Sequence, residues 1–272
     1  MITIDLQGIP VPALGFGTWR LRGDEARTAI NTALGAGYRH LDTAQMYENE
    51  AEVGQAIRQS GVEREALFLT TKLWRDDLHH ADVLRATDES LRRLGTEYVD
   101  LLLIHWPNEA IDLRETLDAF QEVRTQGKTR LIGVSNFTPS LLAQALDHVP
   151  DLTCNQVEYH PFLNQQTLLE LVRKHGMMLT AYSPIVRGTV AENYTIRAIA
   201  ETHGKSPVQV TLRWLLQQDR VAAIPRSATP DHITANLNLF DFALSEDEMD
   251  RMDALAENRR LINPDFAPAW EG

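Results

Sequence analysis

Four side chains in the first half of the sequence could together move a proton: Asp42, Tyr47, Lys72 and His105. A free tyrosine has a pKa of about 10, which is too high for ready proton exchange at neutral pH. A nearby lysine ammonium lowers that pKa, and a carboxylate keeps the lysine charged and oriented. A histidine can then orient a substrate carbonyl oxygen by hydrogen bonding. The set predicts a proton donor for chemistry at a carbonyl group.

Each of the four residues also has a purely structural interpretation. Asp42 is suited to capping a turn, and Tyr47 to packing at a helix start. Lys72 fits a salt bridge at the rim of a sheet, and His105 fits a polar rim residue. Their positions favour chemistry, because Asp42, Lys72 and His105 each stand at the end of an apolar run suited to a strand.

The elements that must position these residues repeat a short apolar run, a polar turn and a helical stretch. After a hairpin predicted over Thr3 to Val11, eight runs favour strands: Leu14–Phe16, Tyr38–Leu41, Leu67–Thr71, Val99–Ile104, Leu131–Val134, Leu152–Val157, Met178–Ala181 and Val221–Ile224. Between them lie amphipathic stretches such as Ala81–Leu94, with helix starts at Thr138-Pro139, Ser206, Thr229-Pro230 and Ser245. The alternation predicts an α/β fold, a (β/α)8 TIM barrel in one domain over residues 1–272, with a doubly wound open sheet as the alternative.

A barrel of this kind places its functional groups at the carboxyl ends of its strands. The residues there are rich in polar and ionisable side chains: Gly17, Thr18, Trp19, Asp42, Lys72, His105, Ser135, Asn136, Gln156, Tyr182, Ser183, Pro225, Arg226 and Ser227. Packing alone does not explain this concentration. The Pro-rich, aromatic stretch from Asn258 onward reads as an ordered flap or loop rather than a helix.

Composition narrows the class of protein. The 272 residues carry a formal net charge of -12, which argues against nucleic acid or an anionic membrane as the main partner. Cys154 is the only cysteine, so no intrachain disulfide forms and a reducing compartment fits. Neither a secretory signal nor an apolar run of about 18 residues is apparent. Together these features predict a cytoplasmic protein. None of the nine histidines has zinc-ligand spacing, so we expect no metal.

Three spaced stretches resemble the signatures of the aldo-keto reductase family: GYRHLDTAQMYENEAEVG from Gly37, GKTRLIGVSNF from Gly127 and IPRSATPDHITAN from Ile224. The resemblance covers essentially the whole chain. It implies a (β/α)8 barrel that reduces carbonyl compounds with a nicotinamide cofactor. By position, Tyr47 would be the general acid, Lys72 and Asp42 the pair that tunes it, and His105 the residue that orients the carbonyl.

The same resemblance assigns cofactor residues. Ser135, Asn136 and Gln156 match ligands of the nicotinamide amide, and Tyr182 matches the aromatic ring on which the nicotinamide stacks. Arg226, Ser227 and Thr229 match contacts to the adenosine 2′-phosphate, which a guanidinium binds well. Further cofactor positions are Gly17, Thr18, Asp42, Ser183, Pro184 and Asn236. The family's usual arginine and glutamate are replaced by His232 and Ala235, so we expect NADPH preference with some use of NADH left open.

For the substrate, the resemblance implies an apolar wall from Trp19, Trp74 and Trp106 beside His105. The short segment after Tyr182 and the tail, a C-terminal substrate loop, are similar to those of bacterial 2,5-diketo-D-gluconate reductases. That subgroup also reduces methylglyoxal-like dicarbonyls and aldehydes. Arg187 and Arg259 are candidates for a substrate carboxylate, although surface solvation explains either.

Two other functions stay open at this point: a nicotinamide-binding regulatory subunit without significant turnover, and an aldolase that forms a Schiff base on Lys72. The complete set of four residues argues against the first, and an Asp42 that keeps Lys72 protonated argues against the second. The family often works as monomers, and we expect a monomer with a small-molecule carbonyl substrate.

Overall fold

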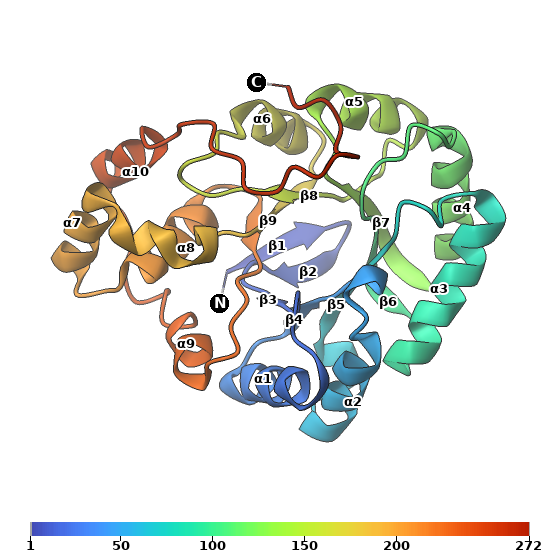
Figure 1. Cartoon of the computed structure of the whole chain (residues 1–272), viewed down its shortest axis with the longest axis horizontal. Coiled ribbons are helices and arrows are strands. Elements are labelled where there is room, and N and C mark those ends of the chain that lie inside the picture. The colour runs from blue at the N-terminus through green and yellow to red at the C-terminus, as the bar shows by residue number, and fades with distance from the viewer. Residues whose placement is uncertain (1, 272) are drawn as a thin grey trace.

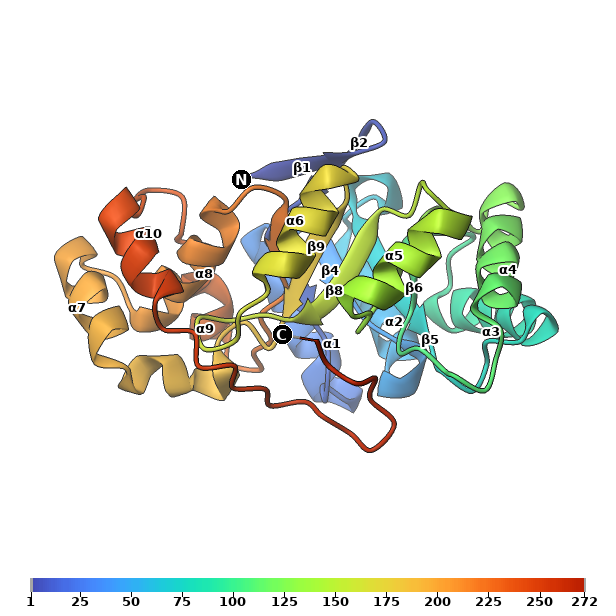
Figure 2. The same ribbon diagram turned by 90° about the horizontal axis from the view of Figure 1, so that it is seen from above.

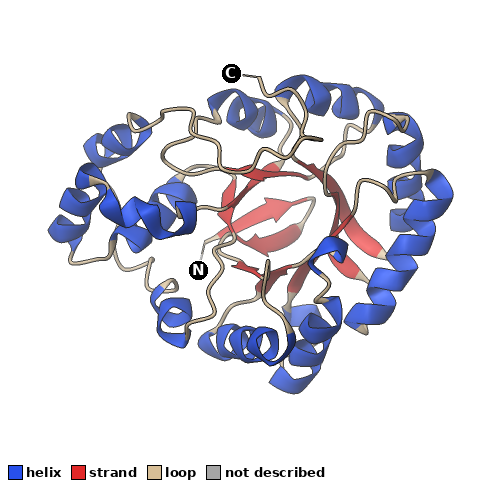
Figure 3. Cartoon of the chain, viewed as in Figure 1, coloured by secondary structure: helices blue, strands red, loops and turns tan. Residues whose placement is uncertain are grey.

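Eight parallel strands curl into a barrel in the computed structural model, which describes residues 2–271 (Figures 1 and 3). The strands run in sequence order around the sheet: β3 (Phe16–Gly17), β4 (His40–Asp42), β5 (Phe68–Leu73), β6 (Val99–Ile104), β7 (Thr129–Ser135), β8 (Cys154–Glu158), β9 (Met178–Tyr182) and β10 (Val221–Ala223). The amides of Gly15 and Ala223 donate 2.9 Å and 2.8 Å hydrogen bonds to the carbonyls of Ala223 and Ala13. These bonds join the first strand segment to the last, so the predicted barrel is confirmed over the open sheet.

Helices form an outer layer around the strands (Figure 3). They are α1 (Gly23–Ala36), α2 (Glu50–Ser60), α3 (His80–Leu94), α4 (Leu113–Thr125), α5 (Pro139–His148), α6 (Gln166–Lys174), α7 (Tyr194–His203), α8 (Pro207–Gln217), α9 (Pro230–Ala235) and α10 (Glu246–Asp253), with short 3-10 turns η1 (Gln45–Tyr47), η2 (Arg64–Ala66) and η3 (Val186–Glu192). No helix within residues 2–271 is long and apolar enough to cross a membrane.

Most of the predicted helix starts are capped as their sequences indicate. The Thr138 side chain accepts a hydrogen bond from the Leu141 amide, and Ser206 and Ser245 each form a complete capping box. Thr229 precedes Pro230 at the start of α9, but its side chain accepts no capping bond. Local sequence therefore sets where most of these helices begin.

The two ends of the barrel are covered differently (Figure 2). The hairpin of β1 (Thr3–Leu6) and β2 (Ile9–Pro12) lies across one end, turning at Gln7 and Gly8 with φ of 55° and 82°. Two successive positive φ values give a tight turn whose twist matches that of the paired strands. The tail from residue 258 crosses the opposite end without regular secondary structure. The hairpin therefore closes the base, and the tail crosses the end where chemistry is expected.

Six of the eight strands, β4 and β5 among them, extend further at their carboxyl ends than the apolar runs predict. Asp42 is the last residue of β4, and Lys72 is the fifth of six residues in β5, where each was expected just past a strand. In the sheet register Asp42 pairs with Thr70, and Lys72 pairs with Leu103. The strands continue through these polar residues because strand pairing uses backbone hydrogen bonds, which do not depend on the type of side chain. Both charged groups therefore lie within the barrel wall and are buried.

Close packing of α2 against the end of α3 supplies a stability test. A Cβ added at Gly54 would overlap the backbone of Leu94, whereas one added at Gly35, on the exposed side of α1, would meet no atom within 4 Å. We expect Gly54→Ala to destabilise the protein by about 1–3 kcal/mol or more through overpacking. Gly35→Ala should stabilise it by roughly 0.5–1 kcal/mol, because alanine loses less backbone entropy in a helix.

The unfolding midpoints of both variants in urea, with the slope of each transition checked, measure these effects. Equal stability of the two variants would contradict the tight α2–α3 contact.

Candidate active site

The buried ammonium of Lys72 brings three of the four predicted residues together. Its Nζ lies 2.5 Å from Asp42 Oδ1, 3.3 Å from Tyr47 Oη and 2.9 Å from the carbonyl oxygen of Thr43. The Lys72 and Asp42 side chains are 0% and 1% exposed. The ring of His105 lies 5.6 Å from that of Tyr47, edge to face. The four residues therefore form one compact group at the carboxyl end of the barrel.

Hydrogen bonds on both sides of Tyr47 hold the loop that carries it. The side chain of Gln45, two residues earlier, accepts a 2.8 Å hydrogen bond from the Trp74 amide at the end of β5. Two residues after Tyr47, the buried Asn49 amide donates to the carbonyls of Thr18 and Leu21 at 2.8 Å and 2.9 Å. The 3-10 turn between these anchors fixes the direction of the phenol. Sequence reasoning missed Gln45 and Asn49, whose only signal is their place on either side of Tyr47.

Burial and charge set the protonation states of this group. Burial alone would lower the pKa of Lys72, but the Asp42 carboxylate and Tyr47 outweigh it and raise that pKa, so the lysine stays charged. For Tyr47, burial raises the pKa and the charge of Lys72 opposes the rise without cancelling it. Lys72 thus lowers the pKa of Tyr47 as expected, but burial outweighs it and the net shift of that pKa is upward. The phenol is protonated at neutral pH.

His105 is a neutral imidazole. Burial, and after it the charge of Lys72, hold the pKa of His105 well below its usual value. Its Nδ1 is buried without a hydrogen-bond partner among residues 2–271. A neutral imidazole carries one N–H, which suits it to donate to an oxygen without adding a positive charge.

A second network joins this group to four of the predicted cofactor residues. Gln156 Nε2 donates to Asp42 Oδ2 at 2.7 Å, and Ser135 Oγ donates to the Gln156 carbonyl at 2.7 Å. Asn136 Nδ2 donates to Ser135 Oγ at 3.1 Å, and Tyr182 Oη donates to Asn136 Oδ1 at 2.8 Å. The carboxyl ends of β4, β7, β8 and β9 are thus linked by a continuous path of side-chain hydrogen bonds. Asn136 adopts a left-handed φ of 62°, which asparagine tolerates better than most residues.

The remaining predicted cofactor residues fall into three sets. Thr18 donates its hydroxyl to the Asp42 carbonyl on the neighbouring strand β4 at 2.9 Å. A Cβ at Gly17 would lie 2.7 Å from the Ile224 carbonyl, so Gly17 lies where the barrel closes. Pro184 and Asn236 are buried and Ser183 is half-buried, with Ser183 at a φ of 50°. On the loop after β10, Arg226 and Thr229 are exposed and Ser227 is half-buried; His232 on α9 is also exposed.

Aromatic rings from three segments form a wall beside His105. Trp74 packs on His105 at 5.3 Å between ring centroids and on Phe266 at 5.6 Å, and Trp106 packs on Phe266 at 5.5 Å and on Trp270 at 6.1 Å. On the other side Trp19 lies 4.8 Å from the ring of Tyr47 and is 41% exposed. Phe266 and Trp270 come from the tail and were not among the predicted substrate residues; the aromatic content of the tail was their signal.

Arg187 and Arg259, the two candidates for a substrate carboxylate, are exposed. The Arg259 guanidinium carbon lies 6.0 Å from the ring centroid of Phe162. No described contact joins either residue to Tyr47 or His105.

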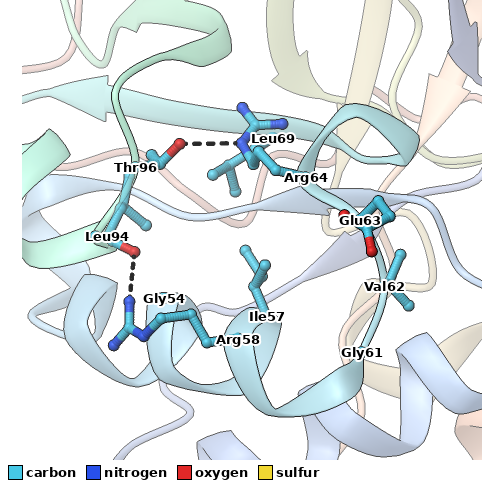
Figure 4. A pocket seen from close by; sticks show the side chains of 11 residues that line it. Gly54, Ile57, Arg58, Gly61, Val62, Glu63, Arg64, Leu69, Leu94 and Thr96 are labelled. Carbon is cyan, nitrogen blue, oxygen red and sulfur yellow. Dashed lines mark hydrogen bonds between the residues drawn. The ribbon is translucent and has the colours of Figure 1, made fainter.

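Two hollows lie at different distances from this group. A cavity of about 300 Å³ sits between the ends of α2 and α3, where Arg58 and Arg64 donate to the Leu94 carbonyl and to Thr96 (Figure 4). It lies toward the amino ends of β5 and β6, away from the four residues. A second cavity of about 580 Å³ adjoins the aromatic wall, with Phe266, Ile104 and Arg75 among its lining. The second cavity meets the aromatic wall only at Phe266, and none of Asp42, Tyr47, Lys72 and His105 lines either cavity.

A barrel with these groups at its carboxyl end defines an oxidoreductase of the aldo-keto reductase class, and residues 13–257 match the model of the Aldo/keto reductase family. The chain belongs to that family, so it is an enzyme that acts on carbonyl groups.

Among its relatives, methylglyoxal reductase DkgB of Salmonella typhi is 39% identical over 96% of this chain and 99% of that protein. A crystal structure described as a candidate 2,5-diketo-D-gluconic acid reductase B is 43% identical, with a TM-score of 0.96 over 99% of this chain and 97% of the other. A Bombyx mori aldo-keto reductase in complex with NADP is 35% identical, with a TM-score of 0.90 over 96% and 95% of the two chains.

The Lys72–Asp42 pair predicts a strong dependence of each partner on the other. Lys72→Met should destabilise the protein by about 3–5 kcal/mol, because it leaves the Asp42 carboxylate buried without its counter-ion. The double variant Asp42→Asn/Lys72→Met should recover much of that loss, because neither charge is then buried.

Urea unfolding of the wild type, both single variants and the double variant gives the coupling energy. A single Lys72→Met variant as stable as the wild type would contradict the pairing.

Proposed function

We propose that this protein is an NADPH-dependent reductase of small aldehydes, α-dicarbonyls and keto-sugar acids, with Tyr47 as its general acid. The observation that carries the proposal is the buried Lys72 ammonium, which contacts Asp42 at 2.5 Å and Tyr47 at 3.3 Å beside the neutral His105. A protonated phenol, a fixed cation and an uncharged N–H donor together suit the protonation of a carbonyl oxygen.

The proton would leave Tyr47 Oη for the substrate oxygen as that oxygen gains negative charge. Lys72 stabilises the phenolate that remains, because its ammonium is within hydrogen-bonding distance and stays charged. Asp42 holds the ammonium in place. His105 would donate its N–H to the same carbonyl oxygen and fix its orientation, and the neutral state of the imidazole prevents it from competing as the acid.

The residues at the carboxyl ends of the strands fit a nicotinamide cofactor, which supplies the hydride when bound. Asn136 and Gln156 provide amide groups beside one another, and Tyr182 provides a ring fixed by its hydrogen bond to Asn136. A flat ring held at one edge is suited to stacking against a planar heterocycle. Ser135 and Asn136 would hold the amide of the nicotinamide together with Gln156.

The loop after β10 supports a preference for NADPH. Arg226 is exposed there, and the Ser227 hydroxyl accepts a 3.0 Å hydrogen bond from the Thr229 amide, which shapes the loop. An exposed guanidinium can bind a phosphate through two parallel hydrogen bonds. His232 in place of an arginine leaves this preference dependent mainly on Arg226.

The names of the relatives support the substrate class. One is a methylglyoxal reductase, and a solved neighbour is described as a candidate 2,5-diketo-D-gluconic acid reductase. The aromatic wall, with Trp74 packed on His105, fits the apolar part of a small carbonyl compound. A Schiff base on Lys72 is disfavoured, because a nucleophilic amine must be neutral and the pKa of Lys72 is raised.

The decisive test replaces only the phenol oxygen. Tyr47→Phe should lower the rate of methylglyoxal and 2,5-diketo-D-gluconate reduction by roughly 10²–10⁴-fold, the typical contribution of a positioned acid. The Kd for NADPH should change little. Oxidation of the reduced nicotinamide, followed by absorbance, measures turnover, and quenching of tryptophan fluorescence measures binding.

Retained turnover in the Tyr47→Phe variant would sink the assignment of the acid. A wild type that binds NADPH tightly but reduces neither substrate would favour a regulatory subunit.

Cofactor preference is tested separately at Arg226. Arg226→Ala should raise the Kd for NADPH about tenfold, the loss of a charge-assisted contact at an exposed site, while the Kd for NADH stays nearly unchanged. Arg251→Ala, which removes an equally exposed arginine from α10, controls for the change in net charge. Equal weakening of both cofactors would contradict a 2′-phosphate contact.

A further inference from the structure

Glu158 is a buried carboxylate that the proposed chemistry does not use. It is the last residue of β8, two positions after Gln156, and it is 0% exposed. A buried charge is costly unless several hydrogen bonds compensate it. Its partners therefore indicate what it is for.

Those partners come largely from the tail. Glu158 Oε1 accepts from the Leu261 amide at 2.7 Å and from His160 Nε2 at 2.9 Å, and Oε2 accepts from the Ile262 amide at 2.8 Å. Burial alone would raise the pKa of Glu158, but these three donors outweigh it and lower the pKa. The carboxylate thus stays charged and clasps two consecutive backbone amides of a segment that has no regular secondary structure.

From this anchor the tail folds back on itself. The Arg260 guanidinium lies 3.7 Å from the ring centroid of Trp270, and Asn263 Oδ1 accepts a 2.8 Å hydrogen bond from Trp270 Nε1. Residues on both sides of the clasped amides therefore hold Trp270, which packs on Trp106. Phe266, between these contacts, packs on both Trp74 and Trp106.

The far end of the tail is held more weakly. The Glu271 carboxylate accepts from the amide of Ser140 at 3.2 Å and from its hydroxyl. Both residues are exposed, so water and salt compete with the contact. The Arg259 amide also donates to the Phe162 carbonyl at 2.9 Å, just before the amides that Glu158 binds, but only Glu158 binds the tail through a buried charge.

We propose that Glu158 is a positioning residue for the substrate: its hydrogen bonds to the Leu261 and Ile262 amides set where Phe266 and Trp270 stand in the aromatic wall, whose Trp74 packs on His105. Glu158 and Gln156 both lie on β8. The same strand therefore positions the aromatic wall and the candidate nicotinamide site. The kinetic part of this proposal rests on the proposed carbonyl reduction, whereas the clasp itself does not.

The test uses Glu158→Gln, which keeps the size of the side chain but offers one acceptor oxygen in place of two. Amide hydrogen exchange across residues 259–270 should accelerate about tenfold or more, the loss expected for a buried charged acceptor. Exchange in helix α8 should not change. The KM for methylglyoxal should rise about tenfold, with kcat within about threefold and the Kd for NADPH within about twofold of wild type.

Two variants make the result specific. Glu158→Asp keeps the charge but withdraws the carboxylate by one methylene from the Leu261 and Ile262 amides, so its tail exchange and KM should resemble those of Glu158→Gln. It also serves if Glu158→Gln folds poorly. Glu271→Gln, at the exposed anchor, should leave both KM and exchange near wild type.

Unchanged exchange of the tail amides in both Glu158 variants would overturn the clasp. Faster exchange with an unchanged KM would overturn its role in positioning the substrate. A rise in the Kd for NADPH with no change in KM would instead assign Glu158 to the cofactor. A wild type without carbonyl turnover would count against the proposed function, and the exchange data would still decide the clasp.

Discussion

A single positive charge inside the barrel constrains most of this structure. Lys72 is completely buried, and an isolated ammonium there would lose its proton rather than stay charged. Asp42, the Thr43 carbonyl and the phenol of Tyr47 surround it and keep it protonated. The loop that carries Tyr47 therefore has to lie over the carboxyl end of the barrel, and hydrogen bonds of Gln45 and Asn49 hold it there. Removing either charge alone leaves the other uncompensated.

The two ends of the barrel have different tasks. At the amino end of the strands, another buried carboxylate, Asp100, accepts from Arg64 at 2.8 Å, from Arg130 at 3.0 Å and from the Leu69 amide at 2.9 Å. These contacts join β5, β6, β7 and the 3-10 turn η2, and they expose no reactive group. At the carboxyl end the polar side chains meet in a shared network with ring faces beside it. This division is the usual one in barrels of this type.

The candidate substrate wall depends on contacts between segments far apart in the sequence. Trp74 follows β5, Trp106 follows β6, and Phe266 and Trp270 belong to the tail, yet the rings pack in one row next to His105. Because the tail supplies two of the four rings, the position of the tail determines the position of the row. Glu158 and the contacts of Arg260 and Asn263 with Trp270 give that tail a defined course without a helix or strand.

The sequence by itself determined the barrel and three of the four capped helix starts that it predicts, since apolar periodicity and capping residues act over a few neighbouring positions. It also pointed to Asp42, Tyr47, Lys72 and His105, because charged and polar residues at strand ends have few structural uses. Only the tertiary structure decided that burial raises the pKa of Tyr47 and that Glu158 clasps the tail. Both depend on how much solvent and which distant groups surround a side chain, and no local pattern of residues carries that information.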